Sequence, residues 1–454
     1  MEMNHQKRVA FHTLGCKLNY AETAALSKQF LDRGFCIVEF GGPTDVFVIN
    51  TCSVTEHADR ECRQLIRKAL RISPDACAIV VGCYAQLQPD EIASIEGVDF
   101  VLGAKEKFEL FRYSENFQKR STPKIACGSI NEATSFGPAY SSGSADRTRA
   151  FLKVQDGCDY HCAFCTIPLA RGASRSQSIE TTLHQARDLV RRGYKEIVLT
   201  GVNVGDYGLK VGSNLMALLG QLEEIEGLRR IRISSIEPNL LSRDMIRHIK
   251  ASGKICHHFH IPLQSGNDDI LKLMRRRYLS GYYRDLIYGI KEEIPDAGIG
   301  ADVIVGFPGE TESHFEKTYL FLVELPLSYL HVFSYSQRPG TAAVHLPRVV
   351  ETKVRARRSE MLRILSVKKR HQFYRGFVGR TVEVLMEGTI EGGHRIGHTG
   401  QFARVGVPGH SARENEIVNV KITSVEDQLC VGFVMAENEY RVAAPQESLC
   451  GAVA

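Results

Sequence analysis

Three cysteines in one short segment have a spacing that can hold an iron–sulfur cluster. Cys158, Cys162 and Cys165 form a C-x3-C-x2-C pattern, and Phe164 stands directly before the last cysteine. A 4Fe–4S cluster normally takes four thiolates, so three leave one iron open to a small molecule. Zinc is the main alternative, but this spacing is unusual for a zinc finger and no second pair of ligands lies nearby. The segment therefore predicts a 4Fe–4S cluster.

Three further cysteines stand where predicted strands end in the first 119 residues. Cys16, Cys52 and Cys83 each follow an apolar run that predicts a buried strand. Because parallel strands bring their carboxyl ends to one edge of a sheet, the three thiols should converge there. One such cysteine alone would favour a packing role, but three at equivalent positions predict a second metal cluster. The other seven cysteines match no motif, and we expect them to be packing or surface residues.

The elements that position these cysteines follow from the apolar pattern. In the N-terminal and central parts, strand-like runs alternate with helical periodicity, which is typical of parallel sheets covered by helices. The expected strands are 8–14, 46–51, 78–82, 98–102, 150–155, 196–201, 230–235, 258–263, 301–306 and 329–335. The expected helices are 21–33, 57–72, 179–192, 215–225, 243–251, 282–294 and 310–325.

The last hundred residues have a different character. Residues 353–373 predict a basic helix, because positions 351–380 hold ten Lys or Arg and two Glu, a net charge of +8. Such a helix favours an anionic partner, with a solvated basic surface as the alternative. Short β runs follow and predict a small all-β barrel. They lie at 381–386, 402–407, 417–425 and 429–434.

Composition indicates the cellular compartment and the domain organisation of the chain. Thirteen cysteines in 454 residues without a secretory signal fit a reducing cytoplasm in which several cysteines bind metal. No apolar run is long enough to span a membrane. A stretch rich in Ser, Gly and Thr predicts a linker. We therefore expect an α/β multidomain chain with an N-terminal domain at 6–119, a linker at 120–148, a core at 149–374, a barrel at 375–438 and a flexible tail at 439–454.

The 157–165 segment resembles that of the radical S-adenosylmethionine (SAM) enzymes. The resemblance implies that Cys158, Cys162 and Cys165 hold a cluster whose open iron binds the methionine moiety of SAM. It further implies that one electron cleaves SAM to a 5′-deoxyadenosyl radical. The six central β/α units are similar to the partial TIM barrel of these enzymes, in which chemistry takes place at the strand carboxyl ends.

Polar residues after the central strands match further sequence motifs of that family. Gln264 lies in a His-x-Pro-x-Gln-Ser-Gly word that begins at His260. The resemblance implies SAM contacts from Phe164, Gly201, Asn203, Ser235, Glu237 and Gln264. His257, His258 and His260 crowd one run, but no carboxylate or cysteine motif completes a metal site there. Arg275–Arg277 either cap a helix C-terminus or face a substrate phosphate.

With its N-terminal cysteines, the chain resembles the methylthiotransferase family of radical SAM enzymes. In that family the cysteines that match Cys16, Cys52 and Cys83 hold a second 4Fe–4S cluster, which carries sulfur, and a second SAM supplies the methyl group. The word His-Thr-Gly-Gln-Phe at 398–402 is similar to the TRAM domain, an RNA-binding barrel.

The resemblance implies a tRNA-modifying enzyme that methylthiolates C2 of N6-threonylcarbamoyladenosine at position 37, in the anticodon loop. Val54 and Thr55, after Cys52, resemble the branch with this substrate. An electron donor of the flavodoxin or ferredoxin type is implied as a partner. Alternatives within the family are N6-isopentenyladenosine in tRNA and an aspartate of a ribosomal protein. A non-catalytic iron–sulfur RNA-binding protein is the alternative from another class, although the presence of all six motif cysteines argues against it.

Overall fold

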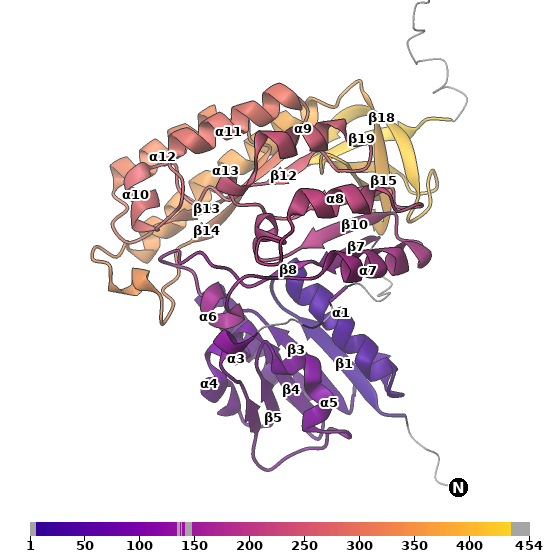
Figure 1. Ribbon diagram of the computed structural model, residues 1–454, viewed down its shortest axis with the longest axis vertical. Coiled ribbons are helices and arrows are strands. Elements are labelled where there is room, and N and C mark those ends of the chain that lie inside the picture. The colour runs from indigo at the N-terminus through magenta and orange to yellow at the C-terminus, as the bar shows by residue number, and fades with distance from the viewer. Residues whose placement is uncertain (1–5, 134–136, 138, 141–147, 437–454) are drawn as a thin grey trace, which may run out of the picture.

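The computed structural model describes residues 6–133, 137, 139, 140 and 148–436. They form an N-terminal sheet domain, a central open barrel and a C-terminal closed barrel (Figure 1). This architecture confirms the predicted α/β multidomain fold. The predicted tail at 439–454, residues 437–438 of the predicted last domain and much of the predicted linker lie outside the described residues. Within those residues, no helix has both the length and the apolar character needed to cross a membrane.

The N-terminal domain is a six-stranded parallel sheet in the order β2-β1-β3-β4-β5-β6. Its strands are β1 Arg8–Thr13, β2 Cys36–Val38, β3 Val46–Thr51, β4 Cys77–Gly82, β5 Val98–Leu102 and β6 Lys124–Ala126. Its helices are α1 Lys17–Leu31, α2 Glu56–Ile72, α3 Cys83–Leu87, α4 Pro89–Ala93 and α5 Leu110–Tyr113. Alternate residues of β3 point to opposite faces, so Phe47 packs with α2 and Val48 packs with α1. The buried central strands therefore have the continuous apolar sequences that predicted them.

The sequence missed both edge strands of this sheet. β2 and β6 contain three residues each, which is too short to show an alternating pattern. β6 pairs with β5 through Phe100 and Lys124. Residues 124–126 therefore belong to the N-terminal sheet, and the prediction that 120–148 is a linker is wrong at these positions.

The central domain is an open barrel of six parallel strands. They are β7 Arg149–Lys153, β10 Glu196–Thr200, β11 Arg230–Ile233, β12 His258–His260, β13 Gly298–Val305 and β14 Tyr329–Ser334. The sheets β11-β10-β7 and β12-β13-β14 meet at a bridge between Ser235 and His260. The strands thus follow one another around the barrel in sequence order.

Helices cover the outside of this barrel. They are α7 Ile179–Arg191, α8 Leu215–Glu223, α9 Arg243–Ala251, α11 Ser280–Glu293, α12 Glu312–Glu324 and α13 Thr352–Arg375. Shorter elements near the strand ends are β8 Gln155–Asp156, α6 Ile167–Arg171, β9 Arg175–Ser176 and α10 Asp268–Leu273. Outward-facing residues such as Leu152, Ile197 and Ile231 form one core with the helices. The alternate residues face the barrel interior, and many of these are polar.

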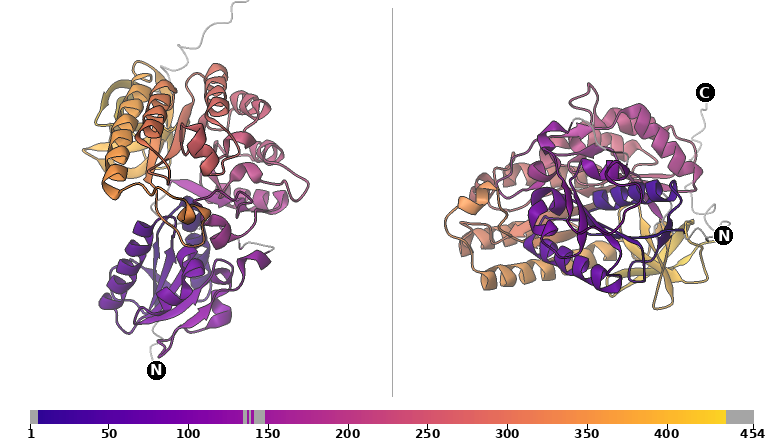
Figure 2. Two further views of the ribbon diagram at one scale, coloured as in Figure 1. Left: turned by 90° about the vertical axis from the view of Figure 1, so that its left-hand side faces the viewer. Right: turned by 90° about the horizontal axis from the view of Figure 1, so that it is seen from below.

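The C-terminal domain is a closed five-stranded barrel in the order β15-β16-β17-β19-β18. The strands are β15 Thr381–Glu391, β16 His394–Thr399, β17 Arg404–Pro408, β18 Ile417–Glu426 and β19 Leu429–Val434. The predicted all-β barrel is confirmed, although β16 was not among the predicted runs. The N-terminal domain lies at one end of the molecule, and the C-terminal barrel lies beside the central domain at the other (Figure 2).

The turn at 399–402 closes the amino-terminal end of the central barrel. Arg232 donates hydrogen bonds to the carbonyls of Thr399 (3.1 Å) and Gly400 (2.9 Å). The Phe402 ring lies 4.9 Å from the His258 ring, inside that end. The segment that resembles the TRAM domain therefore attaches the C-terminal barrel to the central domain. The opposite end of the central barrel, where its strands terminate, remains accessible for chemistry.

Candidate active site between two sets of cysteines

The structure brings Cys16, Cys52 and Cys83 together at one edge of the N-terminal sheet. They follow β1, β3 and β4, which are neighbours in the sheet. Gly15 has φ +103°, and a Cβ there would lie 2.7 Å from the Cβ of Cys52, so only glycine allows this approach. Burial, and then the neighbouring Cys83 and Cys16, raise the pKa of Cys52 to about 12. The Cys52 thiol therefore holds its proton, which metal binding would release.

The structure also brings Cys158, Cys162 and Cys165 together in the loop after β8. Burial is the main cause that raises the pKa of Cys158 and of Cys165 to about 12, and both thiols also interact with Cys162. Two backbone amides point at sulfur: Tyr160 N–H to Cys158 Sγ and Ile167 N–H to Cys165 Sγ, each at 3.4 Å. Three converging thiols with amide donors fit the cysteine side of a 4Fe–4S cluster.

Arg276 is the nearest cation to this second set. Its Nη1 donates to Cys162 Sγ at 3.0 Å, its Nε donates to Tyr278 Oη at 3.1 Å, and its Nη2 pairs with Glu237. Arg277 stacks on the Tyr160 ring with 3.7 Å between the guanidinium carbon and the ring centroid. Both arginines thus belong to the cysteine loop rather than to a free phosphate site. Sequence reasoning left this question open and missed the contact with Cys162.

Several buried polar atoms at the strand ends have no partner among the described residues. They are Thr200 Oγ1, Asn203 Nδ2, Ser234 Oγ and Gln264 Oε1. All four follow or end strands that point toward the second cysteine set. Since buried polar groups are normally hydrogen-bonded, these atoms fit a polar ligand such as SAM. Two of them, Asn203 and Gln264, were implied as SAM contacts.

Gln155 holds this edge in place. Its side chain donates to the Gly157 carbonyl at 2.7 Å and accepts from the Asn203 amide at 2.9 Å. A Cβ at Gly201 would lie 2.8 Å from Gln155 Oε1, so the backbone passes this side chain closely. Gln155 therefore connects the cysteine loop to the end of β10. No sequence motif predicted this role.

The other implied SAM contacts have partners within the chain. Ser235 Oγ is hydrogen-bonded to His260 Nδ1 at 2.5 Å, and Glu237 pairs with Arg276. Phe164 packs edge-to-face near Phe307, with ring centroids 6.4 Å apart. His260 Nε2 continues to Asp302 Oδ1 at 2.9 Å. His258 faces the same interior but is buried against Tyr329, so the three histidines do not form one cluster.

A pocket of about 190 Å³ lies between the two domains. Val54 and Thr55, just after Cys52, line one side. Cys165 and its neighbours Phe164 and Thr166 line another, and the strand ends of β12, β13 and β14 complete it. The lining also includes Ile167, Gln264, Asp302, Ile304, Phe333, Ser334, Tyr335 and Ser336. The pocket therefore touches segments from both cysteine sets.

Direct contacts hold the two sides of this pocket together. Arg338, after β14, donates to Ser53 Oγ at 2.5 Å and pairs with Asp59 at 2.6 Å. Ser336 accepts a hydrogen bond from the Glu56 amide at 2.9 Å. The loop that carries Cys52 is thus bound to the end of the central barrel.

A buried ionic cluster forms a second connection. Arg171 of α6 contacts Glu22 (2.9 Å) and Asn19 (2.7 Å) of α1, and also Asp156 (3.0 Å) of its own domain. Lys107 and Lys153 also pair with Glu22. Burial alone would raise the pKa of Glu22, but Arg171, Lys107 and Lys153 outweigh it and hold that pKa well below the usual range. The cluster links the helix after Cys16 to the helix after Cys165.

The basic helix predicted at 353–373 exists as α13, but several of its cations are used within the protein. Arg358 pairs with buried Glu310 at 2.6 Å, and Arg357 pairs with Glu312 at 2.7 Å. Lys369 donates to the carbonyls of Val323 and Leu325. Three cations of α13 are thus used within the protein, and the expectation of an anionic partner near residues 351–380 stays a prediction.

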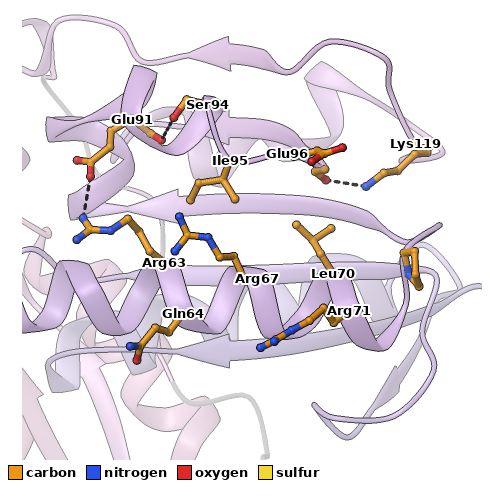
Figure 3. Close-up of a pocket in the computed structure, with 12 residues that line it drawn as sticks. Arg63, Gln64, Arg67, Leu70, Arg71, Glu91, Ser94, Ile95, Glu96 and Lys119 are labelled. Carbon is orange, nitrogen blue, oxygen red and sulfur yellow. Dashed lines mark hydrogen bonds and ion pairs between the residues drawn. The ribbon is translucent and has the colours of Figure 1, made fainter.

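Another basic surface lies on the N-terminal domain. A groove of about 960 Å³ runs between α2 and α4, and Arg63, Arg67 and Arg71 follow one another along α2 at its wall (Figure 3). Arg63 pairs with Glu91, whereas no acidic partner is seen for Arg67 or Arg71 among the described residues. Because Thr55 caps the start of α2, this helix runs from the pocket to the groove.

Two family models match the chain. The model of the Radical SAM superfamily matches residues 152–322, and the one described as "Uncharacterized protein family UPF0004" matches residues 8–103. The chain is 40% identical to "Threonylcarbamoyladenosine tRNA methylthiotransferase MtaB" of Bacillus subtilis, over 91% of this chain and 93% of that protein. It is 41% identical to the Aquifex aeolicus protein of the same name, over 84% and 92%.

The chain also matches one more distant relative and one solved structure. The chain is 31% identical to "tRNA-2-methylthio-N(6)-dimethylallyladenosine synthase" of Acetivibrio thermocellus, over 96% of this chain and 94% of that protein. Among solved structures, the radical SAM methyltransferase TsrM of Kitasatospora setae, with cobalamin and a [4Fe-4S] cluster bound, has a TM-score of 0.52 and 14% identity. That match covers 74% of this chain and 77% of the other, and it shows a shared fold.

Proposed function

The chain belongs to the radical SAM methylthiotransferases that modify tRNA, and we propose that it methylthiolates C2 of N6-threonylcarbamoyladenosine at tRNA position 37. SAM and 4Fe–4S clusters are the cofactors of this family. The observation that carries the proposal is the pocket between the two cysteine sets. Its walls include Val54 and Thr55, the two residues that resemble the threonylcarbamoyl branch.

In this proposal each cysteine set holds one 4Fe–4S cluster. Cys158, Cys162 and Cys165 hold the cluster that binds SAM, and Cys16, Cys52 and Cys83 hold the cluster that carries sulfur. When bound, these groups supply a radical that removes hydrogen from an unactivated C–H bond, and the sulfur and methyl group that replace it. The adenosine base must leave its stack to reach the pocket, as in other enzymes that act on a base.

The protein's own residues position these groups. Asn203 and Gln264 present polar atoms where SAM would lie, and Gln155 holds the Asn203 backbone amide. Arg276 places a positive charge 3.0 Å from Cys162 Sγ, where thiolate charge accumulates. Arg338 and Arg171 hold against each other the two domains that line the pocket. Hydrogen abstraction by a radical needs no general base, and we assign none.

We further propose that the α2 groove binds the RNA backbone and guides the anticodon stem-loop to the pocket. Arginines four residues apart on a helix are about 6 Å apart along its axis, so the row extends away from the pocket in regular steps. Arg67 and Arg71 are exposed, and cations of this kind bind phosphates by releasing condensed counterions. The C-terminal barrel, with its TRAM resemblance, would contribute shape and base contacts.

The groove assignment is tested by tRNA affinity at several salt concentrations. Replacing Arg67 and Arg71 with Gln should weaken binding and reduce the slope of log affinity against log salt by about 1 to 2. Replacing Arg60 and Lys68, on the same helix but outside the groove, removes the same charge and should have a smaller effect. Equal effects of the two pairs would show that general charge, not the groove, attracts RNA.

The substrate is tested by nucleoside mass spectrometry of tRNA from a strain that lacks this gene. Loss of 2-methylthio-N6-threonylcarbamoyladenosine, with recovery on complementation, is expected. Loss of the methylthiolated isopentenyl nucleoside instead would favour the alternative substrate, which the relatives at about 31% identity are named for. The proposal also places the enzyme in the cytoplasm, with an electron donor of the flavodoxin or ferredoxin type.

A further inference from the structure

Part of the interior of the central barrel is open to solvent beside the pocket between the cysteine sets. His260, Asp302, His331 and Phe333 all point inward from β12, β13 and β14, as their alternation with core residues requires. Inward-facing side chains of a barrel are normally packed. Here, however, the His331 side chain is 50% exposed and Phe333 is 41% exposed. We call the space bounded by these four residues the barrel chamber; Asp302 and Phe333 also line the pocket between the cysteine sets.

Lys17 of the N-terminal domain faces the same interior. It lies four residues before Ala21, so the two share one face of α1. Ala21 packs against Phe151 and Val198, which point inward from β7 and β10. Lys17 is one turn closer to the pocket than Ala21, directly after Cys16. α1 thus lies along the β7 edge of the open barrel (Figure 1), and Lys17 is the first residue of this helix.

The electrostatic surroundings of Lys17 agree with this position. The charged groups that act on Lys17 are Arg149, Arg232, Glu196 and Asp302. All four charged groups lie on barrel strands. The side chain is nevertheless accessible to solvent. Lys17 therefore lies among charged groups of the barrel interior and is open to solvent.

The charged groups around Lys17 form ion pairs with other residues. Arg149 pairs with Glu387, Arg232 with Glu196, and His331 with Asp302. For Lys17 no ion pair is found within the part of the chain that the structure describes. The Lys17 ammonium group is therefore available to bind the negative charge of a ligand in the barrel chamber.

We propose that Lys17 is the residue that selects the substrate, by binding the carboxylate of the threonylcarbamoyl group. This inference rests on the proposed function and adds the contact that recognises the modification. A threonylcarbamoyl adenosine carries a carboxylate beyond the base, whereas an isopentenyl adenosine carries only a hydrocarbon. With the base in the pocket, the N6 substituent would extend into the barrel chamber. A lysine there distinguishes the two substituents by charge, because a site built for a polar group rejects an analogue that lacks it.

Asp302 does not compete for this role. Burial alone would raise the pKa of Asp302, but His260 and His331 outweigh it and hold that pKa well below the usual range of a carboxyl. Its charge is thus satisfied by hydrogen bonds to His260 at 2.9 Å and to His331 at 3.3 Å. The lysine remains available for an incoming carboxylate.

The test measures binding of three synthetic anticodon stem-loop RNAs to the iron-loaded full chain. One carries threonylcarbamoyladenosine, the second carries its carboxamide analogue, and the third carries isopentenyladenosine. Wild type should bind the first about 10- to 100-fold more tightly than the second, as expected for a charged hydrogen bond. Lys17→Gln should lose most of this preference while its affinity for the carboxamide RNA stays unchanged. Lys28→Gln, on the same helix and about 16 Å further along it, is the matched control and should retain the preference.

The outcomes separate this inference from the proposed function. Should Lys17→Gln still prefer the carboxylate as strongly as wild type, Lys17 is not the selecting residue. Preference of wild type for the isopentenyl RNA would instead contradict the proposed substrate. Iron content and SAM cleavage without RNA are measured on each variant. If Lys17→Gln binds less iron, Lys17→Arg is compared on the same RNAs; a retained preference supports the proposal and a lost preference with normal iron refutes it.

Discussion

The buried cluster around Glu22 should be the most sensitive point of the contact between the domains. Its side chain is fully buried and pairs with Lys107, Lys153 and Arg171, while Asp156 is the second acid of the cluster. Arg175 also lies 3.6 Å from Asp156, so four cations share two carboxylates. Glu22→Gln would leave four cations with one carboxylate, in a site from which water is excluded.

The expected loss of stability follows from this imbalance of buried charge. Removing one partner of a buried ion pair typically destabilises a protein by about 3–5 kcal/mol, because a buried charge is left uncompensated. In a cooperative unit of about 150–250 residues, each kcal/mol lowers Tm by about 2–4 °C, so Tm should fall by roughly 6–20 °C. Lys107→Met removes one cation and leaves Glu22 with Arg171 and Lys153. It should cost less, on the order of 1–2 kcal/mol.

Calorimetry of the anaerobic protein, with iron content and SAM cleavage on the same samples, measures this. The expected order of Tm is wild type above Lys107→Met above Glu22→Gln. Because Arg171 follows the Cys165 loop, Glu22→Gln should also loosen the pocket and lower product yield. Equal Tm values for the two variants, or a lower Tm for Lys107→Met, would refute the charge-balance reasoning.

Three further predictions concern single groups. Cys158→Ala should abolish 5′-deoxyadenosine formation but leave iron at the N-terminal set, as followed by product analysis and iron content; deoxyadenosine formation in the variant would contradict the assignment. Arg338→Met should lower the free energy of unfolding by about 3–5 kcal/mol, as is typical when a buried ion pair is broken, since Asp59 loses its cation; a change below about 1 kcal/mol would show that this contact is dispensable. For Glu196, burial would raise the pKa, but Arg232 outweighs it and lowers the pKa to about 2, below the unfolded value near 4.5. Its contribution of roughly 3 kcal/mol is therefore fully present above about pH 4.5 and is lost between there and about pH 2, and acid titration of Tm for Glu196→Gln against wild type should show a smaller loss in the variant.

Much of the fold could be predicted because its buried strands carry period-two or continuous apolar patterns. β3 and β5 matched their predicted bounds, and the six central strands were all found in order. The convergence of Cys16, Cys52 and Cys83 followed from one topological rule about parallel strands. Strands of three residues, such as β2 and β6, have too few positions for a pattern, which is why they were missed.

The contacts across the domains could not be predicted in the same way. Arg338 meets Ser53 from 285 positions away, and Arg171 meets Glu22 from 149 positions away. Neither pair has a local signal, because a polar contact between distant segments leaves each residue looking like an ordinary surface residue. The burial of two α13 cations could not be predicted for the same reason. A run of basic residues does not reveal that Arg358 and Lys369 face acceptors within the protein.

The central claim is that the two cysteine sets act on one substrate in separate roles. It is tested most directly by the Cys52→Ala protein, incubated with reductant, SAM and tRNA that contains N6-threonylcarbamoyladenosine. Both 5′-deoxyadenosine and the methylthiolated nucleoside are quantified by mass spectrometry. The claim predicts that 5′-deoxyadenosine still forms while the methylthiolated nucleoside is absent, because the central set is intact and the sulfur carrier is lost. A normal yield of the methylthiolated nucleoside from this variant would contradict the claim.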